Sequence, residues 1–192
     1  MAAGKTIQSE MLQACRLRKS VILVGMMGAG KTAVGTATAR LLGVPFVDSD
    51  DEITQAARRS IAEIFERDGE AFFRARESEV LARLLQGNPV ILSTGGGAFL
   101  NPANRDMIAR AGVAVWLRAD LDLLWQRVRH KTTRPLLRTA DPRAALAQIF
   151  AARTPVYALA DLVVDAAPDL SVDGMARKVI AALASRPDVL AE

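Results

Sequence analysis

The segment that most constrains this chain lies at residues 25–32 and reads GMMGAGKT, which matches the phosphate-binding P-loop pattern G-x-x-x-x-G-K-[ST]. The apolar run at 20–24 predicts a buried parallel strand before it, and apolar residues at helical spacing follow it as far as Leu42. Glycines in such a turn let backbone N–H groups surround phosphate oxygens at the positive end of a helix. Strand, turn and helix together therefore predict a nucleotide site.

The residues predicted to contact the nucleotide belong to this segment or follow it directly: Gly28, Ala29, Gly30, Lys31, Thr32 and Ala33. Lys31 is expected to reach the β- and γ-phosphates, and the Thr32 hydroxyl to help hold Mg²⁺. The alternative is a glycine turn without function that happens to precede a helix. The flanking strand and helix argue against that alternative.

The chain has 192 residues, a length that suits one domain spanning 1–192. It contains no apolar run near the roughly 18 residues that a membrane span needs, and its polar start has no apolar signal segment. A single cysteine excludes an internal disulfide framework. We therefore expect a cytoplasmic protein without a membrane partner, with an N-terminal extension at 1–18 and a frayed tail at 186–192.

The formal net charge of +4 raises the question of nucleic acid binding. The 25 basic residues are scattered among acids, and aromatic residues are only 5% of the chain. A nucleic-acid surface would need basic residues clustered on one face and, for single strands, aromatic platforms. We expect no nucleic acid partner.

Strand and helix patterns alternate along the chain. Strands are expected near 20–24, 46–47, 90–92, 113–117 and 162–164, with helices between them. This alternation predicts a three-layer α/β fold, in which a mostly five-stranded parallel sheet is covered by helices on both faces. Residues 129–141 are polar, basic and interrupted by proline, as a mobile lid over a phosphate site would be.

Acidic residues follow the short strand expected at 46–47. The carboxyl ends of strands are where open α/β sheets bind ligands. Asp48 and Asp50 are two residues apart and would project on the same side of an extended chain, whereas Asp51 would point away and cap the next helix. The chain lacks the Asn-Lys-x-Asp motif of GTPases and the Leu-Ser-Gly-Gly-Gln motif of transporters. A compact phosphoryl transferase is the remaining class.

From Ser20 to about Ala184 the sequence resembles the shikimate kinase family. Six motifs carry the resemblance in the family's order: residues 25–32, Asp48-Ser49-Asp50, Phe73-Arg74-x-x-Glu77, Gly95-Gly96-Gly97, Arg134-Pro135-Leu136-Leu137 and Arg153-x-x-x-Tyr157. The resemblance implies a P-loop kinase fold with a mobile lid. It also implies ATP-dependent phosphorylation of the 3-hydroxyl of shikimate, giving shikimate 3-phosphate and ADP on the route to chorismate and the aromatic amino acids.

The resemblance also implies roles for residues at the acceptor side. Arg74 and Arg153 match the arginines that bind the shikimate carboxylate, and the backbone of Gly95, Gly96 and Gly97 would approach the substrate. Asp50 matches the carboxylate that holds the acceptor hydroxyl, either as a true base or only to orient it. For Arg74, an ion pair with Glu77 or Glu70 is the alternative.

Other implied roles lie at the nucleotide and the metal. Arg134 matches the lid arginine that meets the transferring phosphoryl group, so Lys31, Asp50 and Arg134 are the expected catalytic residues. Arg127 matches the arginine that stacks on adenine, with a solvated helix position as the alternative. Asp48 is expected to act on Mg²⁺ through water, and Ser93 resembles the residue that replaces the Walker-B acid.

Two other functions compete with this interpretation. One is a kinase of similar fold that acts on gluconate or a related polyol acid, and the other is a regulatory protein that binds nucleotide without turnover. The complete motif set disfavours the first, and the presence of Lys31, Thr32, Asp50 and Arg134 disfavours the second. We expect a monomer whose partners are ATP, with Mg²⁺ as cofactor, and shikimate.

Overall fold

The computed structural model describes residues 16–130, 137 and 139–191. Most of the predicted N-terminal extension lies outside these residues. So does much of the predicted lid, including Arg134.

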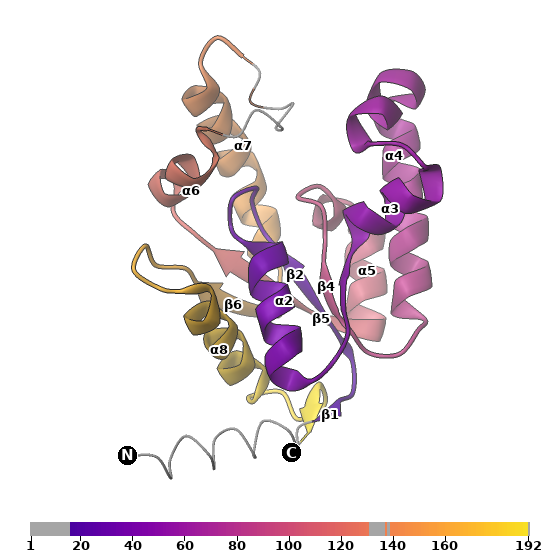
Figure 1. The fold of residues 1–192 in the computed structure, drawn as a ribbon, viewed down its shortest axis with the longest axis vertical. Coiled ribbons are helices and arrows are strands. Elements are labelled where there is room, and N and C mark those ends of the chain that lie inside the picture. The colour runs from indigo at the N-terminus through magenta and orange to yellow at the C-terminus, as the bar shows by residue number, and fades with distance from the viewer. Residues whose placement is uncertain (1–15, 131–136, 138, 192) are drawn as a thin grey trace.

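Five parallel strands form the central sheet in the order β3-β4-β2-β5-β6 (Figure 1). Their bounds are Ser20–Val24 for β2, Phe46–Asp48 for β3, Ile91–Ser93 for β4, Gly112–Arg118 for β5 and Leu162–Asp165 for β6. The middle strand β2 pairs with β4 on one side and with β5 on the other. The predicted five-stranded parallel sheet is confirmed.

Helices cover both faces of the sheet. In Figure 1, α2 (Lys31–Leu42) and α8 (Val172–Leu183) lie side by side in front of it, and α5 (Pro102–Ala111) lies behind it against β5 and α4 (Ile61–Leu85). The other helices are α3 (Ser49–Ala57), α6 (Leu121–Val128), α7 (Pro142–Tyr157) and the short 3₁₀ helix η1 (Ala98–Leu100). Because both faces are covered, every residue of β2 is buried, which explains why its sequence is apolar throughout instead of alternating.

Side-chain caps fix where the helices begin. Ser60 and Glu63 form a capping box at the start of α4, in which Glu63 Oε2 accepts from the Ser60 N–H at 2.8 Å. Side chains also cap the helices that begin after Asn101, Asp120 and Ser171. Each such cap contributes about 1 kcal/mol.

Gly69 interrupts α4. Its φ of 83° and ψ of 170° lie in a region that is essentially restricted to glycine. The helix therefore bends at this residue, and its second half carries Arg74 and Glu77 toward the carboxyl end of the sheet.

The acidic segment after β3 differs from its prediction. The strand ends at Asp48, whose carboxylate accepts the N–H of Asp50 at 3.0 Å and caps α3. Asp50 therefore lies in the first turn of a helix, not on a strand, and the predicted cap role of Asp51 is wrong. The reason is that an N–H group at a helix start needs an acceptor, and Asp48 supplies it first along the chain.

The two ends of the described chain pair with each other. Strand β1 (Arg16–Leu17) is antiparallel to β7 (Leu190–Ala191). Val189 and Leu190 are buried, so these tail residues are not frayed as predicted, because apolar burial offsets the cost of ordering them. Beside them, Arg186 and Lys19 hold the pKa of the Asp188 carboxyl below its usual range.

Candidate active site

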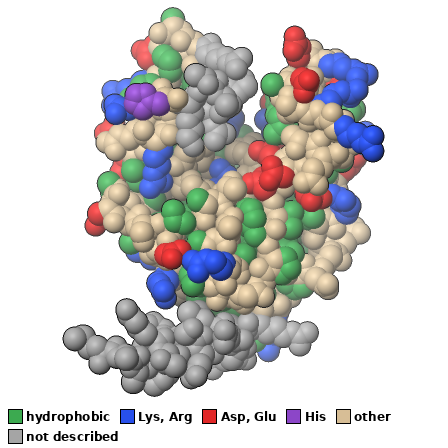
Figure 2. All heavy atoms as spheres, in the orientation of Figure 1, with side chains coloured by type: hydrophobic (Ala, Val, Ile, Leu, Met, Phe, Trp, Pro, Cys, Tyr) green, Lys and Arg blue, Asp and Glu red, His purple; other side chains and the backbone are tan. Residues whose placement is uncertain are grey.

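A cavity of about 480 Å³ lies at the carboxyl ends of β2, β3 and β4. Figure 2 shows the surface hollowed between two raised parts of the molecule, with acidic side chains at the edge of the hollow. Its lining comes from the P-loop, α2, the end of β3, the first turn of α3, the end of β4 with the loop after it, α6, and residues at and just before the start of α8: Met27, Gly28, Ala29, Gly30, Lys31, Thr32, Ala33, Val34, Asp48, Asp50, Ser93, Thr94, Gly95, Gly96, Arg127, Leu170, Val172 and Met175. This is the edge of a parallel sheet at which ligands are expected to bind.

The P-loop forms the floor of the cavity. Gly28 and Gly30 have φ values of 84° and 94°, in the left-handed region that glycine adopts without steric cost. A side chain at Gly28 would also place its Cβ only 2.7 Å from Val128 of α6. The turn then enters α2 directly at Lys31, so the positive end of that helix faces the cavity.

Lys31 turns back over the loop that precedes it. Its Nζ donates to the carbonyl oxygens of Gly25 at 2.9 Å and Met26 at 3.1 Å. The ammonium group thus lies beside the turn that would surround a phosphate.

The three N–H donors of a lysine ammonium allow Lys31 to keep a backbone contact while it also binds a phosphate oxygen. This geometry suits the role predicted for Lys31 at the β- and γ-phosphates.

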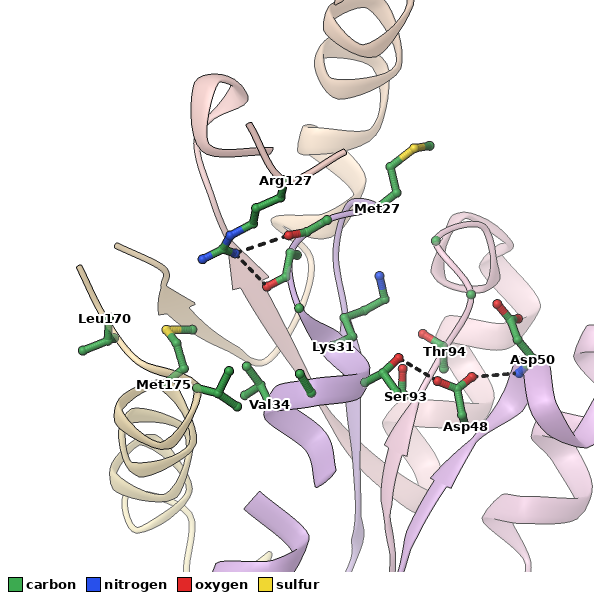
Figure 3. Close-up of a pocket in the computed structure, with 18 residues that line it drawn as sticks. Met27, Lys31, Val34, Asp48, Asp50, Ser93, Thr94, Arg127, Leu170 and Met175 are labelled. Atoms are coloured by element: carbon green, nitrogen blue, oxygen red, sulfur yellow. Dashed lines mark hydrogen bonds between the residues drawn. The ribbon is translucent and has the colours of Figure 1, made fainter. Parts of the chain in front are cut away.

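Three oxygen-bearing side chains meet beside the P-loop (Figure 3). Thr32 Oγ1 donates to Asp48 Oδ2 at 2.9 Å, and Ser93 lies directly opposite Asp48 in the pairing of β3 with β4. Within the described residues, no group of three or more His, Cys, Asp or Glu side chains is placed to hold a metal ion. A cation here would thus be held by one carboxylate, hydroxyl groups and nucleotide phosphates, which fits the way Mg²⁺ binds in kinases.

Arg127 reaches the P-loop from α6. Its Nη1 donates to the carbonyl oxygens of Gly28 at 3.3 Å and Ala29 at 3.5 Å, as the dashed lines in Figure 3 show. It is therefore not merely a solvated helix residue, which was the alternative raised from sequence. Val34 and Met175 form part of an apolar wall of the same cavity.

Arg74 lies at the acceptor side and has two carboxylate partners. Its Nη1 donates to Glu77 Oε2 at 2.9 Å, and its Nη2 donates to Glu70 Oε1 at 3.2 Å. Both ion pairs weighed from sequence are present, but an arginine has five N–H donors, so they leave capacity for a further carboxylate. The guanidinium lies against Gly97, where a Cβ atom would be 2.3 Å from Nη1.

Glu77 is buried, with 2% of its side chain exposed. Burial raises the pKa of its carboxyl, the nearby Arg74 opposes that rise, and Asp50 adds to it. A Cβ atom at Gly95 would be 2.8 Å from Asp50 Oδ1 and 2.9 Å from Glu77 Oε1. Only a glycine at this position lets the two carboxylates approach the loop so closely.

Helix α7 contributes two donors to the same loop. Arg153 Nη1 and the Tyr157 hydroxyl both donate to the carbonyl oxygen of Gly96, at 3.2 Å and 2.5 Å respectively. The ring of Tyr157 is 1% exposed and lies 6.2 Å from that of Trp116, centroid to centroid. Burial raises the pKa of the Tyr157 hydroxyl, with Arg153 opposing the rise.

A family model described as shikimate kinase matches residues 27–184. The chain belongs to the shikimate kinase family. A shikimate kinase of Ruegeria pomeroyi is 66% identical over 177 residues, which cover 92% of this chain and 91% of that protein. One from Cereibacter sphaeroides is 65% identical over 175 residues, covering 91% of this chain and 87% of that protein.

A solved structure supports the same family. It is the shikimate kinase from Acinetobacter baumannii in complex with shikimate, which is 35% identical to this chain with a TM-score of 0.83. The alignment covers 92% of this chain and 97% of that one. The resemblance to the shikimate kinase family that was drawn from six motifs is therefore confirmed, as is the three-layer α/β fold.

The structure brings most of the site residues predicted for a shikimate kinase to one cavity. The cavity is lined by the six residues predicted to contact the nucleotide in and next to the P-loop. It is also lined by Asp48, Asp50, Ser93, Gly95, Gly96 and Arg127. Arg74, Gly97 and Arg153 adjoin that lining through the contacts given above. The predicted position of Arg134 lies outside the described residues.

Sequence reasoning assigned no site role to several residues that the structure brings here. Glu77 stood in a quoted motif three residues after Arg74, a helical spacing that indicates contact. Tyr157 stood in another motif without a role. The apolar wall of Leu170, Val172 and Met175 carried no signal beyond that of an amphipathic helix.

Proposed function

We propose that this cavity holds ATP and shikimate together and transfers the γ-phosphoryl group to the 3-hydroxyl, giving shikimate 3-phosphate and ADP. Membership of the shikimate kinase family identifies the chain as a kinase that uses these two substrates. The observation that carries the assignment of residues is that a P-loop and an arginine–carboxylate cluster adjoin one cavity.

The nucleotide half of the proposed site is the P-loop. Its backbone N–H groups from Gly28 to Ala33 would surround the phosphates, with the ammonium of Lys31 at the β- and γ-phosphates. Thr32, Asp48 and Ser93 would hold Mg²⁺, Asp48 through water. The ion supplies positive charge to the phosphate oxygens when it is bound. Arg127 would stack on adenine.

The acceptor half binds shikimate by its carboxylate and hydroxyls. Arg74 and Arg153 would bind the carboxylate, since guanidinium groups match that geometry. Backbone groups of Gly95, Gly96 and Gly97 would contact the ring substituents. Asp50 would hold the 3-hydroxyl in line with the γ-phosphorus.

The reaction then needs little covalent assistance, because phosphoryl transfer depends mainly on positioning and charge. A bond forms between the 3-oxygen and the γ-phosphorus as the bond to the β,γ-bridging oxygen breaks. Asp50 would accept the hydroxyl proton or orient that oxygen. Arg134 would stabilise the charge on the transferred group once a lid at about 129–141 closes, and closure would exclude competing water.

We further propose that the protein acts as a monomer in the cytoplasm, without nucleic acid or membrane partners. Among the described residues, no helix combines the length and apolar character needed to cross a membrane. The scattered distribution of the basic residues argues against a polyanion surface.

Release of ADP tests the proposal. The protein is mixed with ATP and Mg²⁺ and given shikimate, gluconate or no acceptor. We expect turnover with shikimate alone. Turnover with gluconate would contradict the assignment of the acceptor residues, and tight ATP binding without any turnover would favour a regulatory protein.

A further inference from the structure

The loop at 95–97 is held mainly through its carbonyl groups. The Gly95 carbonyl accepts the N–H of Ala98 at 3.2 Å, and just beyond the loop the Asn104 amide donates to the Ala98 carbonyl at 2.9 Å. The Gly96 carbonyl differs from that of Gly95, because its donors come from a distant element, α7. The direction of this one carbonyl therefore depends on how the loop contacts α7.

The direction of the Gly96 carbonyl also sets that of the next N–H. The described chain contains no cis peptide bond, so the Gly96 carbonyl and the Gly97 N–H point to opposite sides of one rigid plane. Within the described part of the chain, the Gly97 N–H has no protein acceptor among the hydrogen bonds. It is one of the backbone groups assigned above to shikimate.

We propose that Tyr157 is a positioning residue for shikimate, whose hydroxyl ties the Gly96 carbonyl to α7 and so fixes the direction of the Gly97 N–H. This inference rests on the proposed function. Arg153 shares the same carbonyl, but its guanidinium is also assigned to the shikimate carboxylate. No direct contact with shikimate is assigned to Tyr157, and its ring is buried in the core.

The buried state of Tyr157 supports this role. At 1% exposure its hydroxyl must find an acceptor within the protein, and the Gly96 carbonyl provides one at 2.5 Å. Because burial raises the pKa of the hydroxyl, the group keeps its proton at neutral pH and acts as a donor. Replacing it by phenylalanine would keep the ring and remove only this donor.

The experiment compares Tyr157→Phe with Thr154→Val in the full chain. Thr154 lies on the same helix, and its hydroxyl donates to the Phe150 carbonyl, not to the loop. For Tyr157→Phe we expect the KM for shikimate to rise about five- to tenfold, the effect of one hydrogen bond. The KM for ATP and kcat should stay within about twofold. Thr154→Val should leave all three unchanged.

Two outcomes overturn the inference. One is an unchanged KM for shikimate in Tyr157→Phe. The other is an equal rise in the KM for shikimate and the KM for ATP, which would indicate only a structural role. Both differ from failure of the proposed function, in which the wild-type protein itself would not turn over shikimate.

A second measurement applies if Tyr157→Phe does not fold. Tyr157 is the only tyrosine in the chain, so the ultraviolet absorbance of tyrosinate reports its ionisation alone. We expect saturating shikimate to move the midpoint of that titration upward, because an added carboxylate near the loop disfavours tyrosinate. An unmoved midpoint would overturn the inference.

Discussion

The two halves of the cavity differ in the groups that hold their basic side chains. In the nucleotide half, Lys31 and Arg127 donate to backbone carbonyls of one short turn. In the acceptor half, Arg74 donates to carboxylates, and the residues come from α3, α4, α7 and the loop after β4. The phosphate-binding turn of the first half is therefore local in sequence, although Arg127 reaches it from α6. The second half exists only when distant elements are packed.

This difference indicates which substitutions should impair binding in each half. A phosphate site made of backbone N–H groups depends on glycine conformation and on one lysine. A carboxylate site made of side chains depends on the balance of charges among Arg74, Glu77 and Asp50, because buried charges need partners. Substitutions should therefore separate the two halves by which substrate they affect.

The largest expected effect lies where the halves meet, at Asp50. We expect Asp50→Asn to lower kcat about 10²- to 10⁴-fold, the range for loss of a general base, with ATP affinity near that of the wild type. Steady-state kinetics and calorimetry with ATP measure the two quantities. The control is Asp51→Asn, which changes an exposed neighbour. Wild-type turnover in Asp50→Asn would refute the role of Asp50.

In the nucleotide half, Lys31→Met removes the only charge within the P-loop. We expect kcat to fall about 10²- to 10³-fold, because a preorganised donor to the phosphoryl group is lost. Shikimate binding, measured by calorimetry without nucleotide, should not change. Lys19→Met is the control, since Lys19 is paired with Asp188 at 2.9 Å. An equal loss of shikimate affinity in Lys31→Met would mean that the halves are not separate.

In the acceptor half, Arg153→Ala should have the opposite selectivity. A charge-assisted bond contributes about 1.5–3 kcal/mol, so we expect shikimate affinity to fall about 10- to 100-fold and ATP affinity to stay the same. Arg143→Ala on the same helix is the matched control, because Arg143 pairs only with Asp122 among the described residues. Unchanged calorimetric affinities for both substrates would rule out the carboxylate role.

A smaller effect is expected from a single methyl group at Gly97. The Cβ of Gly97→Ala would displace the Arg74 guanidinium, which lies 2.3 Å from that position. We expect the KM for shikimate to rise about tenfold, since a misplacement near 1 Å is costly. Gly87→Ala serves as the control, because its Cβ would meet its nearest atom at 3.5 Å. A wild-type KM in Gly97→Ala would show that Arg74 can move without loss.

The smallest effect concerns Glu77 and pH. Burial raises the pKa of Glu77 in the folded state, so its contribution to stability is full below the unfolded value, about 4.3, and is lost as pH rises through the folded value. The neutral Glu77→Gln should therefore gain a few degrees of Tm relative to the wild type as pH rises from 4 to about 7.

Thermal unfolding across that pH range checks this prediction, with the exposed Glu79→Gln as control. The same Glu77→Gln variant should bind shikimate less tightly, because Arg74 loses a charged partner. If the wild type instead gained Tm relative to the variant with rising pH, the attraction of Arg74 would outweigh the cost of burying the Glu77 carboxylate.

The contrast between the halves also explains what could be predicted from sequence. The P-loop and the strands follow from residues that are close along the chain, and they were predicted with small shifts in their bounds. The positions of Arg74 and Arg153 were reached only through the family resemblance, because no local pattern brings α4 and α7 to one loop.

The errors in prediction also have local causes. Asp50 was expected on a strand because nothing in the sequence showed that Asp48 would end the strand and cap a helix. The pairing of β1 with β7 joins residues at opposite ends of the described chain, a contact that periodicity does not reveal.

The position of β2 in the middle of the sheet affects how the protein is made. Its Val21 pairs with Ile91, and its Ser20 pairs with Gly112. A ribosome that adds about 5–20 residues per second reaches Ile91 roughly 4–14 s after Val21, so the most apolar strand emerges long before either neighbour exists. During those seconds β2 is a natural target for chaperones, and slowing synthesis between the two should increase aggregation of the nascent chain.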